Sequence, residues 1–302
     1  MRAAMPLTVL ATGLACSLAS AQAHARARVF VASYGNDSNP CSFGAPCRNF
    51  QQAVDVVDPG GEVTAIDSAG FGPISINKAV TITSPDGVEA GIVPVAGGNA
   101  ITVNAGSSDT IGLRGLTING AGNALNGVAF NTGGTLTIQN CVIRNLTGQG
   151  LNFIPSNSSS LSVSNSYVGN NGGHGILVSP SGSASATATF DHVEAQYNGP
   201  SSYGIALVGT STSGTVNGSV KDSVSSNNGG GYLMEGPNLS NLTVVGSVAA
   251  NNHTGVQGRI LATLSISETT NTNNVLNCND FVSSYLDNTI NGTCNVVQAT
   301  KQ

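Results

Sequence analysis

The residues best suited to chemistry lie in two short stretches of the chain. Asp191, His192 and Glu194 form the first stretch, and Lys221 and Asp222 form the second. If the stretches meet, Lys221 or His192 could remove the proton α to a uronate carboxyl while the carboxylates orient the sugar or a cation. The competing interpretation is exposed ion pairs worth at most about 1 kcal/mol each. We favour the ion pairs and keep Asp191, His192, Lys221 and Asp222 as candidate catalytic residues.

Few aromatic side chains accompany this charged set. Tyr167 and Tyr197 lie near it in the sequence and Tyr203 follows. A phenol offers an apolar ring and a hydroxyl that hydrogen-bonds, so Glu194, Tyr167, Tyr197 and Tyr203 are the candidate substrate-binding residues. Calcium would need several oxygen ligands around one point. No such set is recognisable, so we predict no metal site and no cofactor. Ca²⁺ is the one ion that the carboxylates could still bind.

These side chains lie within a repeated sequence unit. The stretch from Leu136 to Ile143 aligns with the stretch from Leu161 to Val168, and the run from Leu264 to Thr269 follows the same pattern. Each unit contains three short runs in which apolar and polar residues alternate, as in strands with one buried face. A small or apolar marker residue recurs once in each unit, at Leu116, Cys141, Ser166, Val193, Ser223, Ser247 and Thr269.

Three strands per repeat predict an all-β parallel β-helix of roughly 8–10 coils of about 25 residues. Equivalent strands of successive coils should lie about 4.8 Å apart and form three parallel sheets around a dry core. The marker residues should face that core, Cys141 among them as a small core residue. A second inward column is expected three residues earlier, at Leu113, Ile138, Val163, Phe190, Val220, Val244 and Ile266.

Asparagine recurs five residues after the marker, at Asn171, Asn198, Asn228, Asn252 and Asn274. Asparagine tolerates the left-handed backbone of a tight corner, and stacked amides can hydrogen-bond from coil to coil. We predict a structural asparagine ladder, with these residues in the left-handed conformation.

The ends of a coil stack must be covered. The sequence Asn49-Phe-Gln-Gln52 matches a capping box, and Phe50, Ala53, Val54 and Val57 recur at helical spacing. This pattern predicts a short amphipathic helix over residues 48–57 that covers the N-terminal end.

The cysteines are spaced as two close pairs. In an oxidising compartment the pairs Cys41/Cys47 and Cys278/Cys294 are the natural disulfides, one near each end of the chain. The predicted organisation is an N-terminal cap with disulfide loop and helix over residues 26–61, coils over 62–277 and a C-terminal cap over 278–302.

The N-terminal segment, residues 1–25, has the features of a secretory signal peptide. Arg2 precedes an apolar run, Leu7 to Ala19, that is too short to span a bilayer, and small residues follow. Cleavage is expected after Ala21, Ala23 or Ala25. The mature protein is therefore predicted to be secreted or periplasmic, without membrane insertion.

Charge is sparse along the whole chain. Charged residues make up 8% of it, with 10 Lys+Arg against 15 Asp+Glu and a net charge of −5, where soluble domains average about 25%. So few cations argue against a nucleic-acid partner.

Three stretches resemble a known family: Arg48-Asn-Phe-Gln-Gln-Ala-Val54, Cys141-Val-Ile-Arg-Asn-Leu-Thr147 and Ser247-Val-Ala-Ala-Asn-Asn252. Together with the coils, the ladder and the capping helix, they are similar to secreted bacterial right-handed β-helix repeat proteins of the pectin lyase-like superfamily. The resemblance covers nearly all of the mature chain and implies a right-handed, single-stranded parallel β-helix. It implies no single function, because this superfamily includes lyases, hydrolases, epimerases, adhesins and inert spikes.

The family's catalytic sets are incomplete in this chain. Gly173-His174-Gly175 resembles part of a polygalacturonase set, but the preceding coil offers no carboxylate for acid–base hydrolysis. Tyr203-Gly-Ile-Ala206 begins an epimerase-like run and then departs from it. We therefore expect a non-catalytic, glycan-interacting or surface scaffold protein with a polysaccharide as partner. The alternatives are a polysaccharide lyase or glycoside hydrolase acting on acidic polysaccharide, and self-association through the coil ends.

Overall fold

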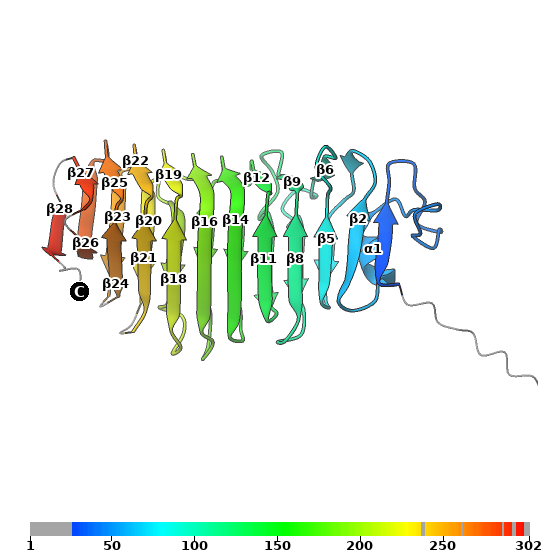
Figure 1. Ribbon diagram of the computed structural model, residues 1–302, viewed down its shortest axis with the longest axis horizontal. Helices are drawn as coiled ribbons and strands as arrows, with labels where there is room; N and C mark the ends of the chain where they lie inside the picture. Colours follow the sequence, from blue (N-terminus) through cyan, green and yellow to red (C-terminus); the bar gives the residue numbers. More distant parts are fainter. Residues whose placement is uncertain (1–25, 237–238, 261, 286, 292–293, 299–302) are drawn as a thin grey trace, which may run out of the picture.

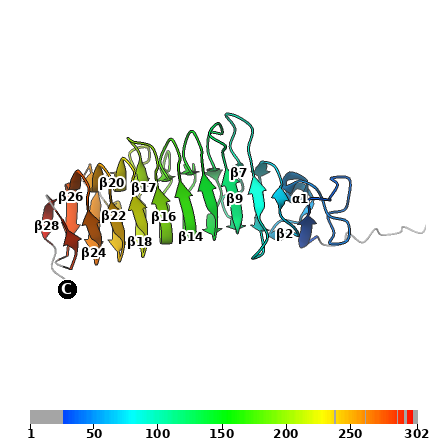
Figure 2. The same ribbon diagram turned by 90° about the horizontal axis from the view of Figure 1, so that it is seen from above.

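The computed structural model describes residues 26–236, 239–260, 262–285, 287–291 and 294–298, so the predicted signal peptide lies outside the described residues. Within these ranges the chain forms 28 strands and one short helix. Figures 1 and 2 show an elongated stack of coils whose equivalent strands run side by side. The fold is a right-handed parallel β-solenoid of about eight turns of about 25 residues, which confirms the predicted fold class.

Three parallel sheets run the length of the stack, and we number them in chain order within a coil. Sheet 1 consists of β1 (Arg28–Val31), β2 (Gly61–Ala65), β5 (Val80–Thr83), β8 (Thr110–Arg114), β11 (Thr135–Gln139), the first halves of β14 (Ser159–Gly169) and β16 (Ala186–Gln196), β18 (Val216–Lys221), β21 (Asn241–Val245), β24 (Thr263–Ser267), the end of β26 (Leu276–Ser284) and β28 (Cys294–Gln298).

Sheets 2 and 3 complete each coil. Sheet 2 consists of β3 (Ala69–Gly70), β6 (Ala90–Ile92), β9 (Leu116–Asn119), β12 (Val142–Arg144), the second halves of β14 and β16, β19 (Val224–Ser226), β22 (Val248–Ala250), β25 (Thr270–Thr272) and β27 (Thr289–Ile290). Sheet 3 consists of β4 (Ile74–Ile76), β7 (Ile101–Asn104), β10 (Val128–Thr132), β13 (Leu151–Phe153), β15 (Ile176–Val178), β17 (Tyr203–Val208), β20 (Gly230–Glu235), β23 (Thr254–Arg259) and the start of β26.

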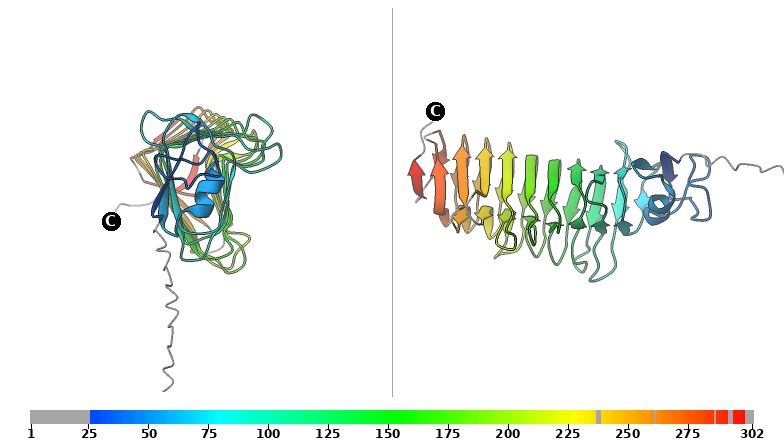
Figure 3. Two further views of the ribbon diagram at one scale, coloured as in Figure 1. Left: turned by 90° about the vertical axis from the view of Figure 1, so that its right-hand side faces the viewer. Right: turned by 90° about the horizontal axis from the view of Figure 1, so that it is seen from below.

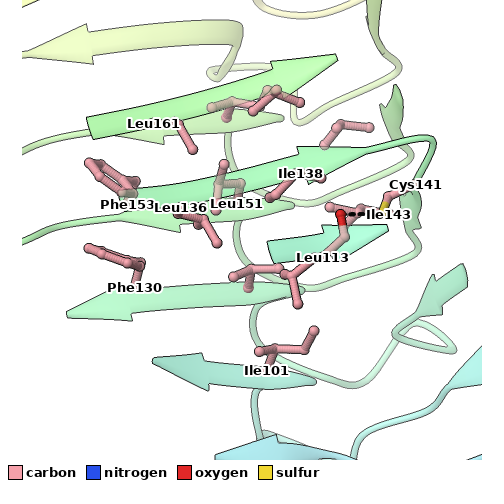
Figure 4. Close-up of a cluster of buried hydrophobic side chains, with 14 of the residues drawn as sticks. Ile101, Leu113, Phe130, Leu136, Ile138, Cys141, Ile143, Leu151, Phe153 and Leu161 are labelled. Carbon is pink, nitrogen blue, oxygen red and sulfur yellow. Dashed lines mark hydrogen bonds between the residues drawn. The ribbon is translucent and has the colours of Figure 1, made fainter. Parts of the chain in front are cut away.

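Stacked apolar side chains fill the space between the sheets. The predicted inward column from Leu113 to Ile266 is in register from coil to coil, and each of its members is at most 1% exposed. Figure 4 shows the rings of Phe130 and Phe153 stacked on each other, and their centroids lie 4.5 Å apart. Because strands of adjacent coils lie about 4.8 Å apart, like side chains meet directly along the axis.

Cys141 belongs to this core, as the marker column predicts. Its side chain is 2% exposed, and its thiol contacts the carbonyl oxygen of Gln139 at 3.3 Å. The thiol also contacts the carbonyl oxygen of Leu113 at 3.7 Å (Figure 4). Burial raises the pKa of the Cys141 thiol to about 11, so the unreactive thiol predominates at neutral pH.

Two columns of residues with positive φ turn the chain around sheet 2. The first column lies between sheets 1 and 2 and comprises Gly115, Asn140, Asn165, His192, Asp222, Gly246 and Glu268. The second lies between sheets 2 and 3 and comprises Asn145, Asn170, Tyr197, Asn227, Asn251 and Asn273. Glycine and asparagine dominate both columns because they adopt the left-handed region at the least cost.

The asparagine ladder forms, but its backbone conformation was predicted wrongly. The left-handed residues are those one position earlier, such as Asn170 and Asn227, whereas the ladder residues themselves are buried, except for the partly buried Asn274. Asn171 Nδ2 donates to Asn198 Oδ1 at 2.9 Å, and the backbone N–H of Asn228 donates to Asn252 Oδ1 at 2.9 Å. The left-handed residue turns the chain, and the next side chain satisfies the polar groups that the turn buries.

Helix α1 (Phe50–Val56) covers the N-terminal end of the core (Figure 3, left). It buries Phe50, Ala53 and Val54, and the Phe50 ring packs on Phe71 with centroids 4.9 Å apart. The predicted capping box does not form, because the Asn49 side chain makes no cap hydrogen bond. It donates instead to Asp37 Oδ2 at 2.6 Å.

Both predicted disulfides are present. Cys41–Cys47 lies beside the N-terminal cap, and Cys278–Cys294 joins β26 to β28. The coil stack itself extends past the predicted coil region, since β1 pairs with β2 at one end and β28 pairs with β26 at the other.

Candidate functional site

The structure brings the two charged stretches together on adjacent coils. Asp191 ends the first half of β16 and Lys221 ends β18, and the two residues are register partners in sheet 1. His192 and Asp222 follow at the first corner, where both adopt positive φ. The corner column carries asparagine or glycine in most other coils, with Glu268 as the exception, so these two adjacent coils place ionisable side chains where most coils place neutral residues. We call Asp191, His192, Lys221 and Asp222 the corner cluster.

The corner cluster contains two short polar contacts. His192 Nδ1 lies 2.9 Å from Asp191 Oδ1, and Lys221 Nζ lies 3.2 Å from Asp222 Oδ2. The four side chains are 39% to 66% exposed. Water screens such pairs, so each contributes little to stability. The geometry is that of an exposed Lys221–Asp222 ion pair beside an exposed His192–Asp191 contact on an outer edge, without a cleft that excludes water.

Lys221 is poorly suited to act as a base. Its hydrogen bond to Asp222, followed by the charges of Asp222 and Asp191, raises the pKa of the Lys221 ammonium. A general base works best when its pKa lies near the operating pH. The neighbouring carboxylates therefore favour the protonated form, which can bind an anion but cannot accept a proton.

Three residues of the corner cluster converge closely enough to be tested as a metal site. Asp191, His192 and Asp222 each offer one ligand atom, and these atoms lie within 4.8 Å of one another. Calcium takes about six to eight oxygen ligands, of which this set supplies only the carboxylates. The Lys221 ammonium already pairs with Asp222 and would oppose a cation there. The fit to Ca²⁺ is therefore poor.

Tyr167 and Glu194 lie beside the corner cluster on the outer face of sheet 2. They are register partners on adjacent coils and line a shallow hollow of about 470 Å³. The Tyr167 phenol covers Gly169, where any Cβ would overlap the ring. Burial, then the neighbouring Tyr197 and Glu194, raises the pKa of Tyr167, although Arg144 opposes this. The hollow is lined by Asn140, Cys141, Val142, Asn165, Ser166, Tyr167, His192 and Glu194.

Tyr197 lies across sheet 2 from the corner cluster, in the second column of left-handed residues. Its side chain is 56% exposed. It borders a second open hollow of about 730 Å³, which is lined by Asn170, Asn171, Gly172, Tyr197, Asn198, Gly199, Pro200, Asn227, Asn228, Gly229, Asn251 and His253. The two hollows therefore flank the outer face of sheet 2, with one tyrosine at each.

From the sequence we singled out Tyr197 and the ladder residues Asn171, Asn198 and Asn228 in the second hollow, but not the rest of its lining. Asn170, Asn227 and Asn251 each precede a ladder residue, and they line this hollow with Pro200 and His253. Their spacing equals that of the ladder, so the signal was present in the sequence. The prediction missed these residues because it assigned the left-handed corner to the next residue, the ladder asparagine.

Tyr203 is separated from this face. It lies in sheet 3, is 9% exposed and packs over Gly230 of the next coil. Its hydroxyl donates to Gln257 Oε1, and its backbone N–H donates to His174 Nδ1 at 2.9 Å. A ring this enclosed has no face free to pack against a sugar, unlike the rings of Tyr167 and Tyr197.

Comparison with known proteins identifies the fold. No protein-family model and no curated protein sequence matches the chain. A pectate lyase crystal structure superimposes with a TM-score of 0.61 at 16% identity, covering 91% of this chain and 78% of the lyase. A rhamnogalacturonan lyase gives a TM-score of 0.53 at 15% identity, covering 86% and 74%. Within the described residues no helix is long and apolar enough to cross a membrane. The chain has a right-handed parallel β-helix fold like that of these two lyases.

Proposed function

We propose that this protein is an extracytoplasmic β-helix protein that binds polysaccharide on the outer face of sheet 2 without cleaving it. The observation that carries this proposal is the placement of Tyr167 and Tyr197 at the two hollows that flank this face. The fold supports a polysaccharide as partner, since its structural neighbours are a pectate lyase and a rhamnogalacturonan lyase.

The two tyrosines suit a sugar chain in complementary ways. Tyr167 is half-buried and held over Gly169, which gives a ring of fixed orientation. Tyr197 is exposed and stands between Asn170 and Asn227 of the adjacent coils. An apolar ring beside amide donors and acceptors matches a sugar, which has apolar C–H faces and a rim of hydroxyls.

Binding without turnover follows from the state of the corner cluster. Lys221, one of the two candidate bases, has its pKa raised by Asp222. The cluster lies on an exposed edge, where water weakens every electrostatic interaction that catalysis would use. Secretion follows from the N-terminal segment, residues 1–25, which we propose is removed by cleavage after Ala21, Ala23 or Ala25.

Binding can be tested with residues 26–302 and a panel of neutral and acidic polysaccharides, by affinity electrophoresis and then calorimetry. Tyr197→Asn places the residue of the neighbouring coils at this corner, so it removes the ring and preserves the backbone. We expect Tyr197→Asn and Tyr167→Ala each to weaken binding about tenfold, a change of about 1.4 kcal/mol. Tyr34→Ala removes a 67% exposed tyrosine at the N-terminal cap and should leave binding unchanged. Equal affinity of all four proteins would exclude sheet 2 as the binding face.

One observation supports an enzymatic alternative to binding without turnover. Asp191, His192 and Asp222 converge within 4.8 Å, and the neighbouring structures include lyases. A lyase or hydrolase acting on acidic polysaccharide would use His192 as the base, with Asp191 to orient it. Turnover of uronate polymers is measured as new unsaturated or reducing ends. If the parent protein is active and the folded His192→Asn and Lys221→Ala variants are both inactive, the enzymatic alternative replaces the binding proposal.

A further inference from the structure

A third hollow lies on a different sheet, at the N-terminal end of the stack. It has a volume of about 670 Å³, within the range of ligand pockets. Strands β1, β2, β5, β8 and β11 of sheet 1 form its floor, and Figure 1 shows β2, β5, β8 and β11 side by side. Threonines dominate the lining, at Thr81, Thr83, Thr110 and Thr137, with Gln139 beside them.

A glycine interrupts the outward column of side chains that lines the hollow. Register pairs Glu62 with Thr81, Thr81 with Gly112, and Gly112 with Thr137. Gly112 is not among the residues with positive φ, so the backbone does not require glycine there. A Cβ at this position would lie 3.0 Å from Thr81 Oγ1. The Thr81 side chain therefore leans over Gly112, and a side chain at position 112 would compete with it for the same part of the floor.

One charge in this hollow is unmatched. Arg28 is paired with Glu62 at 2.9 Å, and Glu62 also accepts a hydrogen bond from Thr64 Oγ1 at 3.0 Å. Arg114 is exposed, and among the described residues its guanidinium has no hydrogen bond, ion pair or ring contact. The hollow therefore presents a free guanidinium and several hydroxyls in a protein of net charge −5.

We propose that this hollow binds an oxyanion carried on a saccharide, with Arg114 as the anion-binding residue. A guanidinium pairs with carboxylate or sulfate through two parallel hydrogen bonds. The threonine hydroxyls and the Gln139 amide surround Arg114 with partners for sugar hydroxyls. The ligand is a uronate carboxylate or a sulfate ester. The site is independent of the proposed sheet 2 surface, because it lies on another sheet and uses none of its residues.

The test measures binding of residues 26–302 to three short oligosaccharides by calorimetry. They are an oligogalacturonate, a sulfated galactan oligosaccharide and the uncharged galactan oligosaccharide. We expect at least one acidic ligand to bind at least tenfold more tightly than the uncharged one, with affinity falling as salt rises. The preferred acidic ligand distinguishes carboxylate from sulfate.

Two variants examine the site itself. Arg114→Gln removes the charge, and Gly112→Thr continues the threonine column and fills the floor; each should weaken the acidic ligand about tenfold or more. Arg259→Gln, which removes one positive charge from sheet 3, is the matched control and should bind normally. The proposal is overturned if no acidic ligand binds, or if the folded Arg114→Gln and Gly112→Thr proteins bind as well as the parent. Loss in Tyr197→Asn but not in Arg114→Gln would assign the ligand to sheet 2 instead.

Discussion

The Asn171 side chain donates a hydrogen bond from Nδ2 to Asn198 Oδ1, one coil further along the stack, at 2.9 Å. The ladder continues from Asn198 Nδ2 to Asn228 Oδ1 at 3.0 Å, and each amide also bonds to backbone groups of the corner. In the described part of the chain no buried side-chain nitrogen or oxygen lacks a partner. The corners can be buried and sharp because this column supplies the hydrogen bonds that strand pairing cannot.

Asn198→Ala tests the ladder. The substitution leaves Asn171 Nδ2 and the Val168 carbonyl without their partner in a buried corner. We expect a loss of about 1–3 kcal/mol in the free energy of unfolding. Asn241→Ala removes an exposed asparagine of sheet 1, where water replaces the amide, and should cost much less. Denaturant titration followed by circular dichroism compares them, and equal losses would show that the ladder adds nothing beyond an ordinary surface asparagine.

His192 tests the left-handed corner. Its φ is 53°, a conformation that a β-branched residue adopts at a cost of about 1–2 kcal/mol. His192→Val should therefore destabilise the fold by about this amount, and His192→Gly should not. His253→Val makes the same chemical change at a position without positive φ and should be nearly neutral. If glycine at 192 proves as costly as valine, the contact with Asp191 matters more than the backbone.

His174 gives the stability a pH dependence. Burial lowers the pKa of this imidazole, and the hydrogen bond from the Tyr203 N–H to Nδ1 occupies the ring nitrogen that a proton would take in the fold. The unfolded chain therefore binds the proton more readily, and stability present above pH 6.5 should fall as the pH drops below that value. His174→Gln should remove this part of the dependence. Unfolding titrations between pH 7.5 and 5 measure the difference between the two proteins, and parallel curves would contradict the assignment.

Cys141 should be inert in the folded protein. Its thiol is buried and its pKa is raised to about 11, so almost no thiolate is available near pH 8. Residues 26–302 with both disulfides intact should show no reactive thiol until denaturant is added, and one thiol afterwards. Rapid reaction of the native protein with a thiol reagent at pH 8 would place Cys141 in an accessible position.

The interior of this protein could be predicted from the sequence. The inward column, the marker column and the ladder asparagines follow from a repeat in which each coil uses the same positions for the same purpose. Hydrophobic alternation is local, so it survives uneven spacing between the repeats. The capping helix could be predicted for the same reason, because its apolar residues recur at helical spacing. Its predicted capping box, however, does not form.

The outer surface was less predictable, because a neighbour one coil away decides what an outward side chain can do. Tyr203 resembles Tyr197 in the sequence, yet Gly230 of the next coil lets its ring lie flat and become buried. The hollow at Arg114 lies where register places Gly112 between Thr81 and Thr137. The sequence by itself therefore determined the coil, its core and its ladder. Only the tertiary structure decided which outward side chains pair, which are covered and which remain free, since contacts about 4.8 Å apart across coils depend on register.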